Sequence, residues 1–383
     1  MQLDEVRVHQ IRLPLSGDFS HSRRGGLFAD NIIVEIIGDQ GNILGYGEGA
    51  PRPYVTGESQ EIAARTVAEF IEGKPFPWEL DDVCQIWDFV DGLPEGKKHR
   101  TAVCGIEMAL LDVLSKGQNR SVIEYFPKDY YTNRVSYGAS IPLGNKERIL
   151  EICGIIRRLG IMNLRIKIGK DHKKNQESMA LVREIFGEHC DLRIDVNGAW
   201  DHELAKKHIN LIKDYGVKVI EQPMMPGDSN IKDFASEMQA CGVMLMADES
   251  ACSLKDVEEI IQERCYEMIN VRLSKCGGFR NSLRIIELLR NNGDAFQIGC
   301  QLGESGVLSA AGRALSLLCG DAIYHDGSYD KFLLKENVTV EPVSFGWGGE
   351  AGPLDGVGLG ITVNREKLER LNNGLSHVSI IRP

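Results

Sequence analysis

The fold is decided by five short apolar stretches that each carry a charged residue at or near the end: LRIKI (164–168), LRIDVN (192–197), VIEQP (219–223), LMADES (245–250) and INVRLSKCGG (269–278). The charged residues follow one another at intervals of 26 to 28 residues, and they are Lys167, Asp195, Glu221, Asp248 and Lys275. Short apolar runs bounded by turn residues are typical of buried strands. The interval is that of one strand-plus-helix unit, so the repeat predicts parallel strands that each present a charge at the same end.

The same alternation of strand and helix extends outward on both sides of these stretches. The full set of predicted strands is Val135–Pro142, Leu164–Ile168, Leu192–Val196, Val217–Gln222, Val243–Asp248, Met268–Ser274, Ala295–Cys300 and Ala322–His325. Eight parallel strands are the number that closes an α/β barrel. An open doubly wound sheet fits less well, because it usually has fewer strands and a glycine-rich phosphate-binding turn after the first one.

In such a barrel the carboxyl ends of the strands form one face, so the five charges are expected to meet at one mouth. Any one of them alone is explained as well by a local surface pair, but five in register are not. Three neighbouring carboxylates repel one another unless a cation lies among them. All-oxygen ligands favour a hard ion, Mg²⁺ first, so the pattern predicts a magnesium site between two lysines.

The chain on either side of the repeat does not continue it. The first 133 residues combine predicted strands with two helices, one near Ser59–Glu72 and a strongly amphipathic one at Thr101–Lys116; the strands are Glu5–Leu13, Asn31–Ile37 and Ile43–Gly47. The final segment returns to strand and loop, and its seven glycines between Ser344 and Gly360 are interpreted as tight turns. We expect an N-terminal α+β domain (1–133), a barrel (134–325) and a C-terminal segment (326–383) that runs back to the first domain.

Composition excludes several classes of protein. The 383 residues are 43% hydrophobic and 26% charged, and 55 Asp and Glu against 44 Lys and Arg give a net charge of −11. Without a basic cluster, nucleic acid and anionic membranes are poor partners. No apolar run approaches the ~18 residues of a membrane span, and the N-terminus does not have the pattern of a signal peptide. The ten scattered cysteines show no zinc-ligand spacing and are interpreted as buried free thiols in the cytoplasm.

With these motifs the sequence resembles the enolase superfamily, specifically the muconate-lactonizing-enzyme-like subgroup of muconate cycloisomerases, dipeptide epimerases and o-succinylbenzoate synthases. The resemblance covers nearly the whole chain and also includes CGIEMALLDVLSKG (104–117) and IGCQLGES (298–305). It implies a modified (β/α)7β TIM barrel with an α+β capping domain built from both ends of the chain. It further implies a homo-oligomer that acts on a small-molecule carboxylate.

The resemblance implies that Asp195, Glu221 and Asp248 bind Mg²⁺, which holds the substrate carboxylate and stabilises the enediolate formed when the α-proton leaves. Lys167 and Lys275 are then the acid–base pair. A base lysine must be neutral, so its pKa is expected to fall from ~10.4 under the influence of the neighbouring cations.

Arg165 departs from the subgroup, because it stands where the first lysine of a Lys-x-Lys motif is usual. A guanidinium group does not deprotonate, so Arg165 is assigned a helper role. Asn197 and Glu249 are expected to orient the ligands, and Glu304 to hydrogen-bond the substrate or Lys275.

Substrate recognition is expected from two capping loops, at 19–26 and 52–57. Arg24 and Tyr54 are the candidates in these loops, with Arg23 and Arg52 as alternative anion-binding groups. Dipeptide epimerases of the subgroup carry Asp-x-Asp after the eighth strand, and this chain has Tyr324-His325-Asp326. The missing first acid weakens a dipeptide assignment, but Asp326 alone can bind an amine.

Three functions are open on the sequence. The favoured one is racemisation or epimerisation of an amino-acid-derived carboxylate, which needs two opposed lysines. The alternative is a lyase or cycloisomerase in which one lysine moves the proton and the other serves as a cation. A non-catalytic binding protein is disfavoured by the intact acids and lysines, and a mandelate-racemase-like site is disfavoured because His325 has no partner on the seventh strand.

Overall fold

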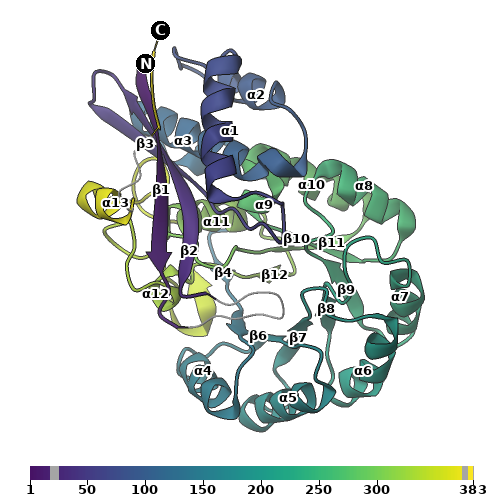
Figure 1. Cartoon of the computed structure of the whole chain (residues 1–383). Coiled ribbons are helices and arrows are strands. Elements are labelled where there is room, and N and C mark those ends of the chain that lie inside the picture. The colour runs from purple at the N-terminus through teal and green to yellow at the C-terminus, as the bar shows by residue number, and fades with distance from the viewer. Residues whose placement is uncertain (18–25, 373–377, 383) are drawn as a thin grey trace.

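The computed structural model of the chain (Figure 1) describes residues 1–17, 26–372 and 378–382. Its larger part is a sheet of eight parallel strands that neighbour one another in chain order: β5 Ala139–Ile141, β6 Asn163–Lys167, β7 Asp191–Asp195, β8 Val219–Glu221, β9 Met244–Ala247, β10 Met268–Val271, β11 Ala295–Ile298 and β12 Tyr324–His325. A parallel bridge between Tyr137 and His325, with Gly138 N donating to His325 O over 2.8 Å, joins the two ends of this order. The predicted α/β barrel is confirmed.

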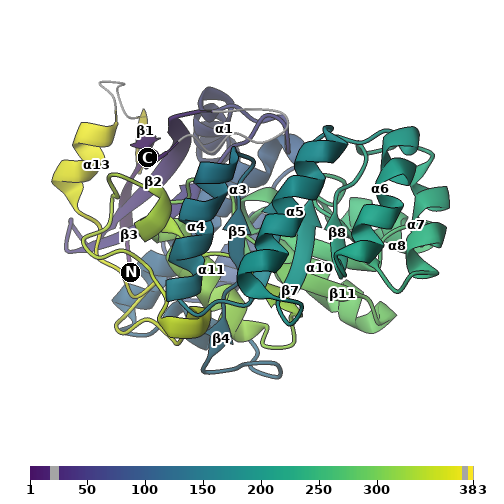
Figure 2. The same cartoon turned by 90° about the horizontal axis from the view of Figure 1, so that it is seen from below.

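Helices lie around the outside of the strands, as Figures 1 and 2 show: α4 Lys146–Arg158, α5 His172–Phe186, α6 His202–Asp214, α7 Ile231–Gln239, α8 Leu254–Glu263, α10 Gly278–Asn292 and α11 Gly306–Leu318. Five of them begin after a residue whose side chain accepts a backbone N–H of the first turn: Asn145, Asp171, Asp201, Ser253 and Ser305. Such caps satisfy donors that a helix leaves unpaired. They therefore fix where each helix begins, above the carboxyl end of the preceding strand.

Most of the predicted barrel strands are shorter in the structure, and in two of them another element takes up the remaining residues. The strand expected over Val135–Pro142 is divided, because β4 (Val135–Ser136) pairs with β13 (Glu350–Ala351) and only β5 joins the barrel. The strand expected over Met268–Ser274 ends at Val271, and the one-turn helix α9 (Leu273–Cys276) follows it. Apolar and polar residues alternate through both boundaries, as in Val135-Ser136-Tyr137 and Val271-Arg272-Leu273, so periodicity did not reveal them.

The second sheet is antiparallel, in the order β14-β1-β2-β3, with β1 Leu3–Pro14, β2 Phe28–Gly38, β3 Ile43–Gly49 and β14 Val378–Ile381. It packs with α1 (Gln60–Gly73), α2 (Val83–Asp91) and α3 (Arg100–Gly117) at one side of the barrel (Figure 1). The sheet thus takes strands from both ends of the chain. The remaining short elements are η1 Lys97–His99, η2 Val122–Tyr125, α12 Asp330–Leu333, η3 Trp347–Gly349 and α13 Arg365–Leu371.

Helix α3 differs from its predicted character. All of its residues except Lys116 and Gly117 are buried, so it is enclosed on every side rather than amphipathic. It lies between β3 of the antiparallel sheet and the barrel helices α9 and α10. Its acids are satisfied inside the protein: Asp112 accepts from Tyr46 N over 2.9 Å, and Glu107 accepts from Arg280 N over 2.8 Å. The helix therefore links the two parts of the molecule.

The approach of β3 to α3 is close enough to require glycine. A Cβ on Gly47 would lie 2.1 Å from Gly105 O, and one on Gly45 would lie 2.5 Å from Ala109 O. Part of the glycine excess thus serves sheet–helix packing, beside the turn glycines of the 344–360 segment, of which Gly356 (φ 105°) is one.

All ten cysteines are free and seven of them are buried, whereas Cys84 is exposed. Among the described residues, no helix has the length and apolar character needed to span a membrane.

Candidate active site

The charged residues at the strand ends are neighbours in the sheet register. Lys167 at the end of β6 pairs with Asp195 at the end of β7, and Asp195 pairs with Glu221 at the end of β8. Asp248 directly follows β9, and Lys275 lies on α9, just after β10. The structure thus brings the five charges of the sequence repeat to the carboxyl ends of five consecutive strands.

The carboxylates of Asp195, Glu221 and Asp248 are fully buried. Two guanidinium groups, those of Arg165 and Arg272, lie among them. Arg165 Nη1 donates to Glu221 Oε2 over 2.6 Å. Arg272 Nη2 donates to Glu221 Oε1 over 2.9 Å and lies 2.6 Å from Asp248 Oδ2. Burial opposes ionisation of Glu221, but these two cations lower its pKa below the usual range. Burial and the charge of Glu221 raise the pKa of Asp195.

Arg272 is a site residue that the sequence analysis did not single out. It directly follows Val271, the last residue of β10, and so holds the position that Asp248 holds after β9. That position was the available signal. Because the predicted strand Met268–Ser274 includes Arg272 as an interior residue, the sequence analysis did not place Arg272 at a strand end.

The two lysines hold the carboxylates at opposite ends of the row. Lys167 Nζ donates to Asp195 Oδ2 and to Asn197 Oδ1, both over 2.8 Å. Lys275 is completely buried, and its Nζ donates to Asp248 Oδ1 over 3.0 Å. Burial lowers the pKa of Lys275, but the Asp248 carboxylate outweighs burial and the pKa is raised. The fall expected for a lysine pKa beside Mg²⁺ stays a prediction, since the nearest charged partner of Lys275 in this structure is the Asp248 carboxylate.

The donor set suits a hard divalent cation. Three fully buried carboxylates stand on adjacent strand ends, and they supply the oxygen ligands that such an ion prefers. Within the described ranges, however, no three His, Cys, Asp or Glu side chains are already grouped as metal ligands. The cationic side chains separate the carboxylates, so an added ion would compete with them. The donor chemistry fits Mg²⁺, and the groups with which the ion competes are Lys167, Lys275, Arg165 and Arg272.

Asn197 links Lys167 to Glu249, the residue after Asp248. Asn197 accepts a hydrogen bond from Lys167, and its Nδ2 donates to Glu249 Oε1 over 3.3 Å. Glu249 Oε2 is buried without a hydrogen-bond partner. Burial, and then the charges of Asp248 and Asp195, raise the pKa of Glu249 to about 7. Glu249 can therefore exchange a proton near neutral pH.

The backbone is strained just beyond two of the strands. Asn197 (φ 49°) and Gln222 (φ 40°) occupy the left-handed region, which non-glycine residues rarely adopt. Gln222 Oε1 accepts from Asp248 N over 3.0 Å and from Ser250 N over 3.1 Å. This side chain thus fixes the backbone that carries Asp248.

Glu304 and Asp326 are engaged with other parts of the protein. Glu304 Oε1 accepts from Gln301 N over 2.5 Å rather than from the lysine on α9, and burial raises its pKa to about 8. Asp326 Oδ1 accepts from Arg193 Nη2 over 3.0 Å, and its Oδ2 lies 3.3 Å from Arg165 Nε. A substrate amine at Asp326 would have to compete with two guanidinium groups.

The capping-loop candidates differ in where they lie. Tyr54 lines the cavity described next. Arg52 is buried and donates to Asn31 Oδ1 over 3.0 Å, so it does not present a free anion-binding group. Arg23 and Arg24 lie outside the described residues.

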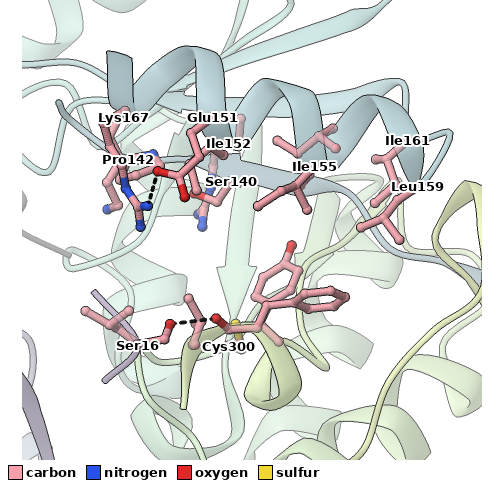
Figure 3. A pocket seen from close by; sticks show the side chains of 18 of the residues that line it. Ser16, Ser140, Pro142, Glu151, Ile152, Ile155, Leu159, Ile161, Lys167 and Cys300 are labelled. Carbon is pink, nitrogen blue, oxygen red and sulfur yellow. Dashed lines mark hydrogen bonds and ion pairs between the residues drawn. The ribbon is translucent and has the colours of Figure 1, made fainter. Parts of the chain in front are cut away.

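A cavity of about 360 Å³ opens beside the charged row (Figure 3). Its polar end is formed by Arg165, Lys167, Asn197, Glu249 and Arg272. Most of its other lining side chains are apolar. A cavity of this size is typical of small-molecule sites, and three cations at one end suit an anionic group of the ligand.

Comparison with known proteins agrees with this arrangement. Residues 151–367 match the family described as enolase C-terminal domain-like. The chain is 26% identical over 388 residues to the hydrophobic dipeptide epimerase of Enterococcus faecalis (strain ATCC 700802 / V583), covering 98% of this chain and 100% of the relative.

Two solved structures share the fold. The crystal structure of the dipeptide epimerase from Enterococcus faecalis V583, complexed with Mg and the dipeptide L-Leu-L-Tyr, superposes with a TM-score of 0.83 at 25% identity, covering 94% of this chain and all of that one. The 2-chloromuconate cycloisomerase from Rhodococcus opacus 1CP has a TM-score of 0.86 at 20% identity, over 97% and 99% of the two chains. At that identity the second likeness concerns the fold alone.

Proposed function

This chain belongs to the enolase C-terminal domain-like family, in the muconate-lactonizing-enzyme-like subgroup of the enolase superfamily, and on that premise we propose that it racemises or epimerises an amino-acid-derived carboxylate with Mg²⁺. The chain is an enzyme of this superfamily. The proposed reaction removes the proton next to the carboxylate on one face of the carbon and returns a proton on the other face.

The placement of Lys167 and Lys275 is the observation that carries the proposal. They stand at strands β6 and β10, which are four places apart in a ring of eight. Strands four places apart lie across the barrel from each other. The two lysines therefore stand on opposite sides of the ring, as inversion at one carbon requires. Lys167 lines the cavity, whereas Lys275 is buried behind it and bonded to Asp248.

Inversion needs one lysine neutral and the other protonated in each direction. Lys275, whose pKa is raised by Asp248, is in the acid form in this arrangement. The Nζ atom of Lys167 donates hydrogen bonds to Asp195 and Asn197. Lys167 and Asn197 both line the cavity.

Asp195, Glu221 and Asp248 are the residues that would hold Mg²⁺. The bound ion would neutralise the charge that develops on the substrate carboxylate. Arg165 and Arg272 stay protonated throughout, so their part is to hold Glu221 and to keep a positive field at the polar end of the cavity.

The test is proton exchange in D₂O with the enzyme, Mg²⁺ and libraries of N-substituted amino acids, dipeptides, hydroxyprolines and acid sugars. We expect deuterium at the α-carbon together with loss of optical purity. If no member of these libraries exchanges its α-proton, the proposal is wrong.

A lyase or cycloisomerase is the second candidate, and the fold shared with 2-chloromuconate cycloisomerase favours keeping it. In that case Lys275 serves only as a cation while Lys167 moves the proton. The same experiment separates the two, because a lyase or cycloisomerase gives a new product and a racemase gives only the deuterated mirror-image or epimeric substrate. Assembly into a homo-oligomer also stays a prediction.

A further inference from the structure

The cavity continues beyond its polar end into a region that the proposed chemistry does not use. We call this region the apolar lobe and define it by six side chains that line the cavity: Ile152, Ile155, Leu159, Ile161, Phe332 and Phe345. Figure 3 shows Ile152, Ile155, Leu159 and Ile161 on one side of an open space, with Ser16 and Cys300 on the other. The lobe is continuous with the polar end at Lys167, so one ligand can occupy both.

The first wall is a face of α4 that the barrel does not cover. Ile149, Cys153 and Ile156 are the buried residues of this helix and pack inward. Ile152, Ile155 and Leu159 are spaced three and four residues apart and are only half-buried, so they form a second apolar stripe. Ile152 and Leu159 touch the hydrophobic core with part of their surface and line the cavity with the rest. The stripe runs along about two helical turns, or about 10 Å.

The second wall consists of aromatic rings fixed by one another. The Phe345 ring lies 5.5 Å from that of Phe332 and stacks on that of Tyr137 at 5.8 Å. Tyr329 packs edge-on against Phe345 at 6.2 Å, and its hydroxyl donates to Gly138 O over 2.7 Å. The rings are thus preorganised, and the hydroxyl nearest the lobe is already satisfied.

We infer that the apolar lobe binds a hydrocarbon substituent of the substrate, so that the substrate is a carboxylic acid whose acyl or alkyl group extends about 10 Å from the reacting carbon. This inference rests on the proposed function for the placement of the carboxylate. The six lobe side chains offer no hydrogen bond, so a polar group placed among them would lose its water without compensation. The polar side chains of α4 that line the cavity, Arg148 and Glu151, are not among the six. A hydrocarbon chain instead removes apolar surface of both ligand and walls from water.

The experiment uses N-acylglycines with acyl chains of two to twelve carbons as probes, titrated into the full-length protein with Mg²⁺ by calorimetry. Each added methylene that enters the lobe is expected to tighten binding by up to about fourfold, until the lobe is full. Ile155→Trp fills the lobe away from the charged row and is expected to abolish the dependence on chain length. Leu150→Trp is the matched control, because Leu150 is on the same helix but 42% exposed, and it should bind like the parent.

Exchange of the glycine α-protons in D₂O is followed on the same samples. A dissociation constant that does not change with chain length in the parent protein overturns the inference, whatever the exchange result and whether or not Ile155→Trp folds. The inference is also overturned if Leu150→Trp loses the dependence of the dissociation constant on chain length as fully as Ile155→Trp does. Tighter binding with chain length but no exchange leaves the lobe in place and counts against the proposed function instead.

Discussion

Arg165 and Glu221 form a buried ion pair in which Nη1 donates to Oε2 over 2.6 Å. The Nε atom of the same guanidinium lies 3.3 Å from Asp326 on the other side. The Arg165 side chain thus joins Asp326, just after the eighth strand, to Glu221, the central acid of the charged row. A lysine, with a single ammonium group, cannot reproduce both contacts.

Arg165→Met is expected to destabilise the protein by on the order of 3–5 kcal/mol, because it leaves buried carboxylates without a partner. Arg165→Lys should recover part of the loss. Urea unfolding of both variants measures this, with Arg158→Met on the exposed surface of α4 as control. Equal stability of the parent and Arg165→Met would mean that the ion pair does not hold the site together.

Lys167→Ala and Lys275→Ala are each expected to abolish racemisation, with a loss of at least about 10²–10⁴-fold. Each variant should still exchange the α-proton of one enantiomer in D₂O, because the remaining lysine faces one side only. Optically pure substrates followed by NMR and polarimetry provide the measurement. Lys170→Ala, exposed three residues beyond Lys167, is the control. Racemisation that survives in either active-site variant would exclude the two-base mechanism.

Removal of Mg²⁺ is expected to lower stability as well as activity. An ion that binds only the folded protein stabilises it by about 2.7 kcal/mol at one hundred times its dissociation constant. Thermal unfolding with Mg²⁺ and with EDTA should therefore differ by several degrees. Asp248→Asn should reduce the difference, since it removes one proposed ligand. Identical unfolding temperatures in Mg²⁺ and EDTA would argue that the acids of the row do not bind the ion.

His325 makes stability dependent on pH. Burial lowers its pKa to about 4, whereas an unfolded histidine titrates near ~6.5. Between these values the unfolded form of this histidine binds more protons, so the contribution of His325 to stability is complete above about pH 6.5 and is lost as the pH drops toward 4, by up to about 3 kcal/mol. His325→Gln should flatten the slope of stability against pH in this window. The exposed His189→Gln should keep it, and an unchanged slope in His325→Gln would refute the assignment.

Gly47 is predicted to tolerate no side chain. The Cβ of Gly47→Ala would meet Gly105 O at 2.1 Å, and such overpacking typically costs 1–3 kcal/mol. Gly73→Ala is the matched control, because a Cβ at this helix-terminal position meets nothing within 4 Å. The denaturant midpoint of Gly47→Ala should therefore lie below that of Gly73→Ala. A midpoint of Gly47→Ala that equals that of the parent would mean that α3 and β3 are free to move apart.

The sequence predicted those features that repeat or are local. The barrel follows from apolar runs at a regular interval, and the cap at Ser59 follows from the preference of its hydroxyl for a helix N-terminus. The row from Lys167 to Lys275 follows from the rule that parallel strands share one carboxyl-terminal face.

Features that depend on contacts between distant residues were not predictable in the same way. Helix α3 is enclosed because the antiparallel sheet packs on one side of it and α9 and α10 on the other, which its own sequence pattern does not indicate. Asp326 has two guanidinium partners because Arg193 lies across the barrel from it, 133 residues away in the chain. The apolar lobe likewise combines α4 with Phe345, and neither segment alone indicates a cavity.

The pairing of β14 with β1 has a consequence for protein synthesis. Glu5 lies opposite Ile381, so the outer strand of this sheet becomes available only after the ribosome has made residues 378–381. Until then the nascent chain carries β1 with one row of unpaired backbone groups, which is a template for pairing with other chains. The barrel strands are complete by His325 and can assemble earlier. Stalled or prematurely terminated chains should therefore aggregate through β1 even when their barrel is intact.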